Sequence, residues 1–337
     1  MSSTKVSVRD ISRKTGYSPA TVSNALNGKR GVSEETARAI RKVAADLGYR
    51  RSSKLRQVQF VIGRNSGRMI DEGSFRLAVV NGVEDEARLN GLTTSYATVE
   101  LSEPETARRE VAALMNDTSS GIILLGTEMI QRDYDLFADP KVPLAIVDGV
   151  SDNHFFDSIV FTNEGSAHRA VNYLINRGHT KIGYIAGSLR IRNFPLRERG
   201  YARALTEAGL PVNLRWRVSL STDSMQNAYH DMLAWLDTMP EMPTAFFAEN
   251  DALAIGAMKA LTERGFDVPG DVSMVGFDDV EFASIAHPSL TTVHVPRADI
   301  GRMAVRKLIE QVEHPTPYTS VTHLSTMFIE RESVRSL

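Results

Sequence analysis

Two short amphipathic segments meet at a tight turn within residues 8–26, and this pair constrains the fold more than any other feature of the chain. Ser7, with an acid three residues later, is a capping signature that starts the first helix, and Gly16 ends it. Ser18 caps a second helix whose first residue, Pro19, stands where a missing N–H is tolerated. So short a pair buries little apolar surface, and its role must lie in what its outer face presents.

The second helix has two faces of different composition. Val22, Ala25 and Leu26 fall at the spacing of a buried helical stripe. The outer face carries only short side chains, namely Ala20, Thr21, Ser23, Asn24 and Asn27. A helix with such a face can enter the major groove of DNA and reach base edges and phosphates without bulk in the way. The helix pair is therefore typical of a DNA-reading unit.

A third helix and an excess of positive charge complete this end of the chain. Ser33 caps the third helix, Glu34 and Glu35 occupy its first turn, and Gly48 ends it. Residues 1–59 contain thirteen Lys and Arg against four Asp and Glu, whereas the remaining residues carry a net charge of −11. This asymmetry is expected when only one end of a protein meets phosphate. The alternative is a basic helical cap that only faces solvent.

Length and composition bound the rest of the fold. With 337 residues and 42% apolar content, the chain can bury a large core in two or three folding units. No apolar run is long enough to span a membrane and no secretory leader opens the sequence, so we expect a cytoplasmic protein without membrane contact. The sequence has no cysteine, which excludes disulfides, thiolate nucleophiles and cysteine-based metal sites.

Beyond residue 60, short apolar runs alternate with helical patterns. The strand candidates are residues 60–63, 121–126, 144–148, 158–161, 181–187, 244–248 and 273–277. The helix candidates are residues 77–89, 105–115, 167–176, 198–208, 225–236 and 252–264. This alternation predicts parallel sheets covered by helices, and so many elements predict two α/β domains.

Polar residues follow several of these strands. In open α/β sheets, ligands bind outside the carboxyl ends of the strands. The residues found there are Asp148, Asn163, Asn250, Asp251, Asp278 and Asp279. Each could be a helix cap, and capping is the favoured single role for Asn250. Together with the planar fork of Arg197, the set suits a polyhydroxylated small molecule held between two domains. The spacing of its acids matches no metal-ligand scheme, so we expect neither a metal nor a cofactor.

Several segments carry a resemblance to a known family. The stretch VSVRDISRKTGYSPATVSNALNGKRGVSEETARAIRKVAADLGY closely resembles the DNA-binding head of the LacI/GalR family of bacterial repressors. Further along, the chain resembles core segments of that family in the family's order, at NRGHTKIGYIAG, RERGYARALTEAG, TAFFAENDALAIGAMKAL, DVSMVGFDD, HPSLTTV and IERES. The resemblance implies a small all-α helix-turn-helix head, followed by a periplasmic-binding-protein-like α/β core of two doubly wound parallel-sheet lobes. It also implies a homodimer and an allosteric small-molecule effector, usually a sugar.

The resemblance assigns roles to individual residues. The effector pocket would be formed by Asp148, Phe161, Arg197, Asn250 and Asp278. Pro19, Ala20 and Asn24 would face bases. The residues that would face the DNA backbone are Ser7, Ser18, Thr21, Ser23, Asn27 and Ser33. As a dimer, the protein would bind a near-palindromic operator in double-stranded DNA.

The resemblance also divides the chain. The head would cover residues 1–49 and a short hinge residues 50–59. The N-terminal lobe would comprise residues 60–161 and 293–321, and the C-terminal lobe residues 162–292 and 322–337.

The hinge departs from the family's pattern. The family usually continues with Pro-Asn and a helix that inserts a leucine into the minor groove, whereas this chain reads RRSSKLRQVQFVIG and is several residues short. We expect a short hinge helix with Arg51, Lys54 and Arg56 on phosphates and Leu55 as the wedge between base pairs. The alternative for Leu55 is ordinary packing on the core. The segment GRNSGRMIDEGSF at the start of the core is unusually polar, and its share of the pocket is open.

Two other classes of protein share parts of this pattern. A solute-binding protein of transport would have the core fold, but it would need a leader and would not use a basic head. An enzyme could also occupy an α/β core. The sequence contains no P-loop, no glycine-rich dinucleotide fingerprint, no G-x-S-x-G elbow and no histidine pair at metal spacing, so we predict a regulator without catalytic residues.

Overall fold

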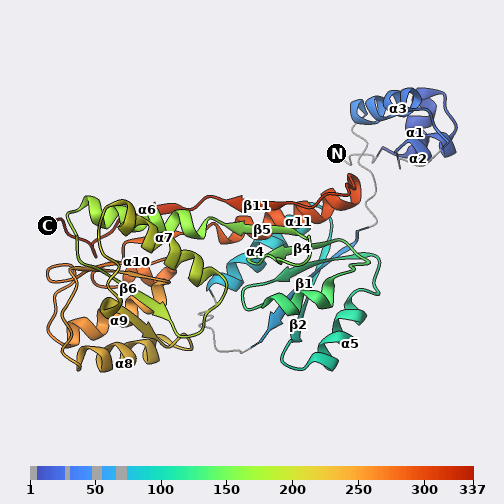
Figure 1. Ribbon diagram of the computed structural model, residues 1–337. Coiled ribbons are helices and arrows are strands. Elements are labelled where there is room, and N and C mark those ends of the chain that lie inside the picture. Colours follow the sequence, from blue (N-terminus) through green and yellow to red (C-terminus); the bar gives the residue numbers. More distant parts are fainter. Residues whose placement is uncertain (1–5, 27–30, 48–54, 66–73) are drawn as a thin grey trace. The chain divides into compact units, whose positions relative to one another are not determined.

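The computed structural model describes residues 6–26, 31–47, 55–65 and 74–337 (Figure 1). They belong to two compact units, a head (Met1–Lys54) and a core unit (Leu55–Leu337).

The head contains the three predicted helices, α1 (Val8–Thr15), α2 (Pro19–Leu26) and α3 (Glu34–Asp46). The capping box of Ser7 is confirmed, and Gly16 ends α1 in the left-handed region at a φ of 76°. Ser18 and Ser33 each accept a backbone N–H three residues later, which confirms them as caps. The small core of the head consists of Ile11, Val22, Ala25, Ala37, Ile40 and Ala44.

The core unit contains two lobes, each built on a parallel sheet. The first lobe has a six-stranded sheet in the order β11-β5-β4-β3-β1-β2. Its strands are β1 (Gln57–Arg64), β2 (Thr93–Glu100), β3 (Ser120–Leu125), β4 (Leu144–Val147), β5 (Asp157–Phe161) and β11 (Val321–Leu324). In the register of this sheet, Phe60 lies opposite Tyr96 on one side and Ile123 on the other.

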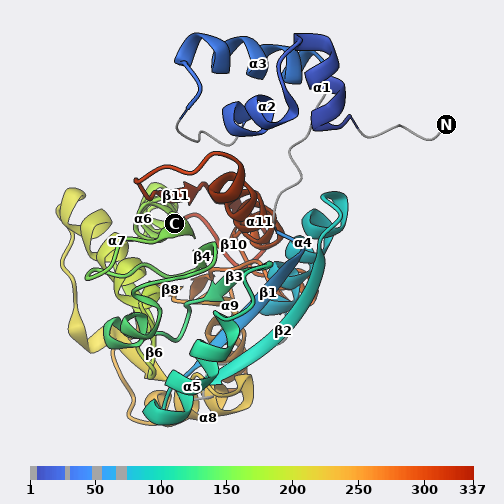
Figure 2. The same ribbon diagram turned by 90° about the vertical axis from the view of Figure 1, so that its right-hand side faces the viewer.

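Helices cover both faces of the first sheet. On one face α4 (Ser74–Leu89) packs against α11 (Arg297–Glu313), as Figure 2 shows. The other face is covered by α5 (Pro104–Leu114) and the 3-10 helix η1 (Gln131–Phe137). Because both faces are covered, all six residues of β3 are buried, which explains its continuous apolar run.

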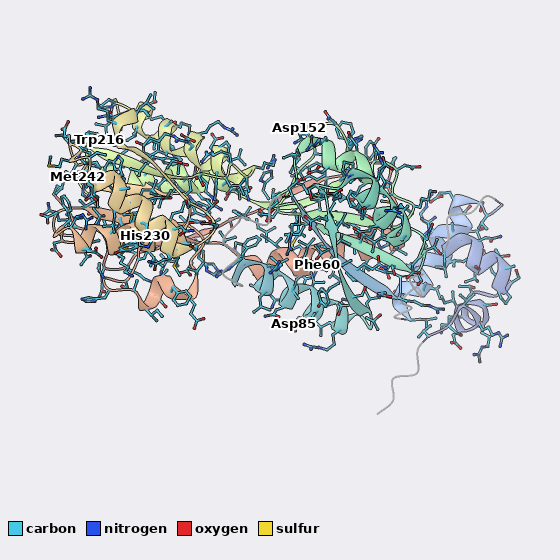
Figure 3. The ribbon with its side chains drawn as sticks, turned by 90° about the horizontal axis from the view of Figure 1, so that it is seen from below. Phe60, Asp85, Asp152, Trp216, His230 and Met242 are labelled. Carbon is cyan, nitrogen blue, oxygen red and sulfur yellow. The ribbon has the colours of Figure 1, made fainter. Side chains whose placement is uncertain are left out.

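The second lobe repeats this plan on a smaller sheet, in the order β7-β6-β8-β9. Its strands are β6 (Ile182–Gly187), β7 (Arg217–Leu220), β8 (Ala245–Ala248) and β9 (Ser273–Val275). Its helices pack in pairs, α6 (Asn163–Asn176) with α7 (Asn193–Glu207) and α8 (Met225–Leu236) with α9 (Asp251–Glu263). Four short elements complete it: η2 (Leu214–Trp216), α10 (Glu281–Ile285), and the strands β10 (Thr292–His294) and β12 (Met327–Ile329), which form an antiparallel pair. Figure 3 labels Trp216, His230 and Met242 in this lobe, and Phe60, Asp85 and Asp152 in the first.

Three of the predicted boundaries differ from the structure. Residues 57–59, predicted as hinge, are the start of β1, because Gln57 and Gln59 alternate with buried residues in the strand. Residues 293–294 belong to β10 of the second lobe, and β11 extends the first lobe to Leu324. β10 and β11 are too short and too polar for the sequence pattern to show where each strand begins and ends.

Candidate functional site

A cavity of about 190 Å³ lies at the carboxyl ends of the strands of both lobes. The structure brings together all five residues predicted for the effector pocket, Asp148, Phe161, Arg197, Asn250 and Asp278. The lining also includes residues that the sequence analysis missed, Ile62, Gly63, Arg64, Phe75, Arg76, Leu125, Thr127, Glu128, Ile191, Asn193 and Phe194.

Two of the predicted acids stand at sharp turns after their strands. Asp148 follows β4 with a φ of 57°, and Asp278 follows β9 with a φ of 109°. A residue with a side chain in this region carries backbone strain of about 1–3 kcal/mol, which the surrounding structure must offset. The strained turns aim both carboxylates at the cavity that they line.

Asp148 is buried and forms hydrogen bonds to both lobes. The Thr127 hydroxyl donates to its Oδ2 at 2.7 Å. Asn193, on α7 of the second lobe, donates from Nδ2 to its Oδ1 at 2.8 Å. Burial raises the pKa of Asp148 to about 6, because desolvation outweighs these hydrogen bonds. The carboxylate therefore has two fixed neighbours and remains beside the cavity.

Arg197 is buried and held on all sides. Its guanidinium lies 3.8 Å from the centroid of the Phe277 ring, so the planar group stacks on an aromatic face. Its Nη2 donates to Asp278 Oδ1 at 3.1 Å, and its Nη1 donates to the carbonyl of Glu249. Burial raises the pKa of Asp278, and the Arg197 charge opposes that shift. The pair is a salt bridge between a buried guanidinium and a partly exposed carboxylate, and its members have little freedom to move.

A continuous chain of hydrogen bonds joins these groups across the two lobes. Arg197 Nε donates to Asn163 Oδ1 at 2.9 Å, and Asn163 Nδ2 donates to Asn193 Oδ1 at 3.1 Å. Asn193 in turn donates to Asp148, which closes the chain to the first lobe. Fixed polar groups of this kind suit recognition of a ligand with several hydroxyls, since their ordering is complete before binding.

The remaining residues predicted at strand ends have other roles. Asn250 lines the cavity and its side chain also caps α9 by accepting the Leu253 N–H at 2.9 Å, so the capping prediction is confirmed. Asp251 is buried and accepts hydrogen bonds from the Val280 N–H and the Thr292 hydroxyl. Asp279 pairs with His294 and Arg331. Asp251 and Asp279 therefore stabilise the second lobe and do not line the cavity.

The sequence contained a signal for some of the missed lining residues but not for others. Arg64 ends β1, and Thr127 and Glu128 follow β3, so the rule that strand ends carry ligands applied to them as well. Asn193 begins α7 after a loop, and no strand or motif marks it.

The outer face of α2 has the character that the sequence predicted. Val22 and Ala25 are buried, while Pro19 and Ala20 are exposed, and Thr21, Ser23 and Asn24 are partly exposed. The capping serines Ser7, Ser18 and Ser33 are exposed at helix N-termini, where backbone N–H groups also favour phosphate. This face of the head is the candidate nucleic-acid interface.

The prediction for Leu55 as a wedge between base pairs is wrong. Its side chain is 4% exposed and packs in the core of the first lobe, close enough that a Cβ on Gly121 would lie 2.9 Å from it. The adjacent residue explains this: Arg56 extends the pairing of β1 with β3, since its N–H donates to the Ser119 carbonyl at 2.7 Å. The Arg56 side chain is exposed, and Asn27, Arg51 and Lys54 lie outside the described residues.

Comparison with known families covers both units. Residues 7–52 match the bacterial regulatory proteins of the lacI family, and residues 171–334 match the periplasmic binding protein-like domain. In the described part of the chain, no helix is long and apolar enough to cross a membrane.

Similar proteins span the whole chain. The HTH-type transcriptional repressor PurR of Haemophilus influenzae is 29% identical, with 98% of this chain and 99% of the relative aligned. The ribose operon repressor of the same species is also 29% identical, at the same coverage. Among solved structures, the complex of the transcriptional regulator CelR with cellobiose is 25% identical, with a TM-score of 0.72 over 98% of this chain and 100% of that one.

Proposed function

Because the chain belongs to the LacI family of bacterial regulatory proteins, we propose that a small polyhydroxylated ligand in the cavity between its lobes controls its binding to an operator. The protein is a DNA-binding transcriptional repressor and not an enzyme. Its site of action is the cytoplasm, where the DNA is.

The hydrogen-bonded chain from Asp148 to Arg197 carries this proposal. It faces the cavity and includes residues of both lobes, so a ligand bound there contacts both lobes at once. A ligand that binds one relative arrangement of the lobes more tightly than another stabilises the first arrangement. The size of this effect is the difference between its two binding free energies. Carboxylate and guanidinium groups recognise hydroxyls, and Phe161 offers an apolar wall to a sugar ring. CelR, which is similar in structure over 98% of this chain, is described in complex with cellobiose.

On the DNA side, two copies of the head would read two half-sites of a near-palindromic operator.

A thermal-shift screen of the full-length protein tests the proposal. Sugars, nucleosides and purines are added singly, and an effector at a hundredfold excess over its Kd adds about 2.7 kcal/mol of stability. We expect a sugar to raise Tm and to change operator affinity. Asp278→Ala should abolish the shift, while Asp139→Ala, an exposed acid outside the cavity, should retain it. If only nucleosides or purines raised Tm, the effector would belong to that class and not to the sugars. A ligand that raised Tm but left operator binding unchanged would refute control by this cavity.

A further inference from the structure

Glu249 is a fully buried acid next to the cavity. It follows β8 directly and precedes Asn250, which lines the cavity. Burial raises the pKa of Glu249, and the charge of Arg190 opposes that shift. A buried carboxylate is costly in free energy unless donors surround it, so the groups that donate to it show which parts of the chain it holds in place.

Three donors surround the Glu249 carboxylate. The Tyr184 hydroxyl donates to its Oε1 at 2.6 Å, and the Gly187 N–H donates to its Oε2 at 2.5 Å. Arg190 donates to Oε1 from Nη1. Gly187 is the last residue of β6, and Arg190 lies in the loop that joins β6 to α7, residues 188–192. The carboxylate therefore anchors this β6–α7 loop both at its start and in its middle.

The anchored loop leads into part of the cavity lining. Ile191 lies in the loop, and Asn193 and Phe194 begin α7 directly after it. The Phe194 ring packs on Gly187, where a Cβ would lie 2.7 Å from the ring, and the Arg190 guanidinium lies 5.8 Å from the ring centroid. A shift of the loop would therefore displace Asn193, whose hydrogen bond joins the two lobes.

The backbone of Glu249 positions a second part of the cavity, because its carbonyl accepts a hydrogen bond from Arg197 Nη1. One residue thus holds cavity groups that follow two paired strands, β6 and β8. If the cavity holds the ligand that controls the repressor, as proposed above, this anchoring sets how far its walls are ordered before binding. We propose that Glu249, which does not itself line the cavity, is a positioning residue for the effector and acts through Arg190 and the β6–α7 loop.

Amide hydrogen exchange of the full-length protein without ligand tests the anchoring. Glu249→Gln keeps the volume of the side chain but presents an NH2 group to one of the three donors, and Arg190→Gln removes the guanidinium. Both variants should raise the exchange rates of residues 187–193 about tenfold or more, since the loop then opens more readily. Arg217→Gln is the matched control, because Arg217 shares the partner Glu198 with Arg190 but lies on β7, and it should leave these rates unchanged.

Titration calorimetry tests whether the anchoring serves ligand binding. The probe is the compound that raises Tm in the screen of sugars, nucleosides and purines. Glu249→Gln and Arg190→Gln should each weaken its binding about tenfold, whereas Arg217→Gln should change it less than about twofold. Arg190→Lys keeps a cation opposite Glu249 and should recover most of the lost affinity. Because Arg190 is partly exposed, its variants decide the question if Glu249→Gln does not fold.

The two measurements separate the possible failures. Unchanged exchange rates in both variants would overturn the anchoring and leave the ligand-controlled repressor standing. Faster exchange with an unchanged Kd would give Glu249 a role in stability alone and would also overturn the inference. If no compound of the panel raised Tm, the proposed control by this cavity and the positioning role would fall together.

Discussion

The salt bridge between Arg197 and Asp278 has consequences for stability as well as for binding. Arg197 is 3% exposed, so removing its partner would leave a buried charge without compensation. Breaking such a pair costs about 3–5 kcal/mol. Because Asp278 is partly exposed, we expect Asp278→Ala to lower the unfolding free energy of the core unit toward the lower end of that range.

Urea denaturation measures this effect. The double variant Arg197→Ala with Asp278→Ala should be destabilised by less than the sum of the two single variants, because no unpaired charge is left behind. Strict additivity would contradict a coupled pair.

Asp148 should make the stability of the core unit depend on pH. Its folded pKa of about 6 lies above the ordinary 3.8, so the folded protein binds the proton more tightly than the unfolded chain. Its contribution is most favourable below pH 3.8 and is lost as the pH rises through 6. Asp148→Asn cannot titrate, and its stability relative to the natural protein should rise between pH 4 and pH 7 by up to about 3 kcal/mol. A difference that stays constant over this range in urea denaturation would show that the carboxyl is not held in the way the structure indicates.

The sequence located cavity residues where a simple rule applied. Asp148 and Asp278 were predicted because each follows a strand, Arg197 was predicted from its planar guanidinium, and Phe161 came with the family resemblance. Asn193 was missed because its role depends on the meeting of two lobes, and no local pattern encodes the distance between residues on separate sheets.

At the scale of elements, each pair of packed helices in the core unit has a glycine at its crossing. A Cβ on Gly82 of α4 would lie 1.9 Å from the carbonyl oxygen of Ala298, and one on Gly301 of α11 would lie 2.2 Å from that of Val79. A Cβ on Gly200 of α7 would lie 2.2 Å from the Glu164 carbonyl oxygen, at the crossing with α6. These contacts hold the helices closer than side chains would allow.

Gly200→Ala should therefore destabilise the protein despite the better helix propensity of alanine. The propensity gain is at most about 1 kcal/mol, whereas forcing the helices apart costs about 1–3 kcal/mol or more. Gly165 on α6 is the matched control, since a Cβ there meets nothing within 4 Å. Thermal denaturation should show a lower Tm for Gly200→Ala and an unchanged or higher Tm for Gly165→Ala. Equal effects of the two substitutions would mean that the close approach carries no energy.

The start of the core unit gives a second prediction at this scale. Leu55 is buried against the first sheet, so Leu55→Ala should lower the unfolding free energy by about 2 kcal/mol, at the low end for a buried leucine, because the residue lies at the edge of the unit. Leu89→Ala, which removes a side chain that is 78% exposed, should have little effect. DNA bending by Leu55→Ala should match that of the natural protein once both are folded. If Leu55→Ala bent DNA less than the natural protein but was equally stable, Leu55 would act as a wedge between base pairs after all.

The sequence predicted the buried strands but not the more exposed ones. All seven strand candidates correspond to strands, because sheets covered on both faces produce continuous apolar runs. β2 was missed because it is an edge strand whose residues, such as Thr93 and Tyr96, remain half exposed or exposed. α11 was also missed, although Ile300, Ala304 and Leu308 stand at helical spacing on its buried face.

For the whole molecule, the concentration of positive charge in residues 1–59 predicts how DNA is bound. Binding to phosphates releases counterions, so operator affinity should fall steeply and log-linearly with salt concentration. Selection from random DNA should return two half-sites related by a dyad. Ala20 variants should change the preferred bases, whereas Ser23→Ala should weaken all sites alike. Selected sequences without dyad symmetry would refute two-fold binding.

The hydrogen bond from Asn193 to Asp148 also bears on how quickly the protein can respond. This hydrogen bond links the two lobes beside the cavity. We expect the ligand to separate the lobes there when it enters or leaves. Opening of the lobes, a motion of microseconds to milliseconds, would then limit how fast the ligand enters and leaves. The time for which operator binding stays in its ligand-controlled state after the ligand disappears would be set by the residence time of the bound molecule, and weakening this one hydrogen bond should shorten that time.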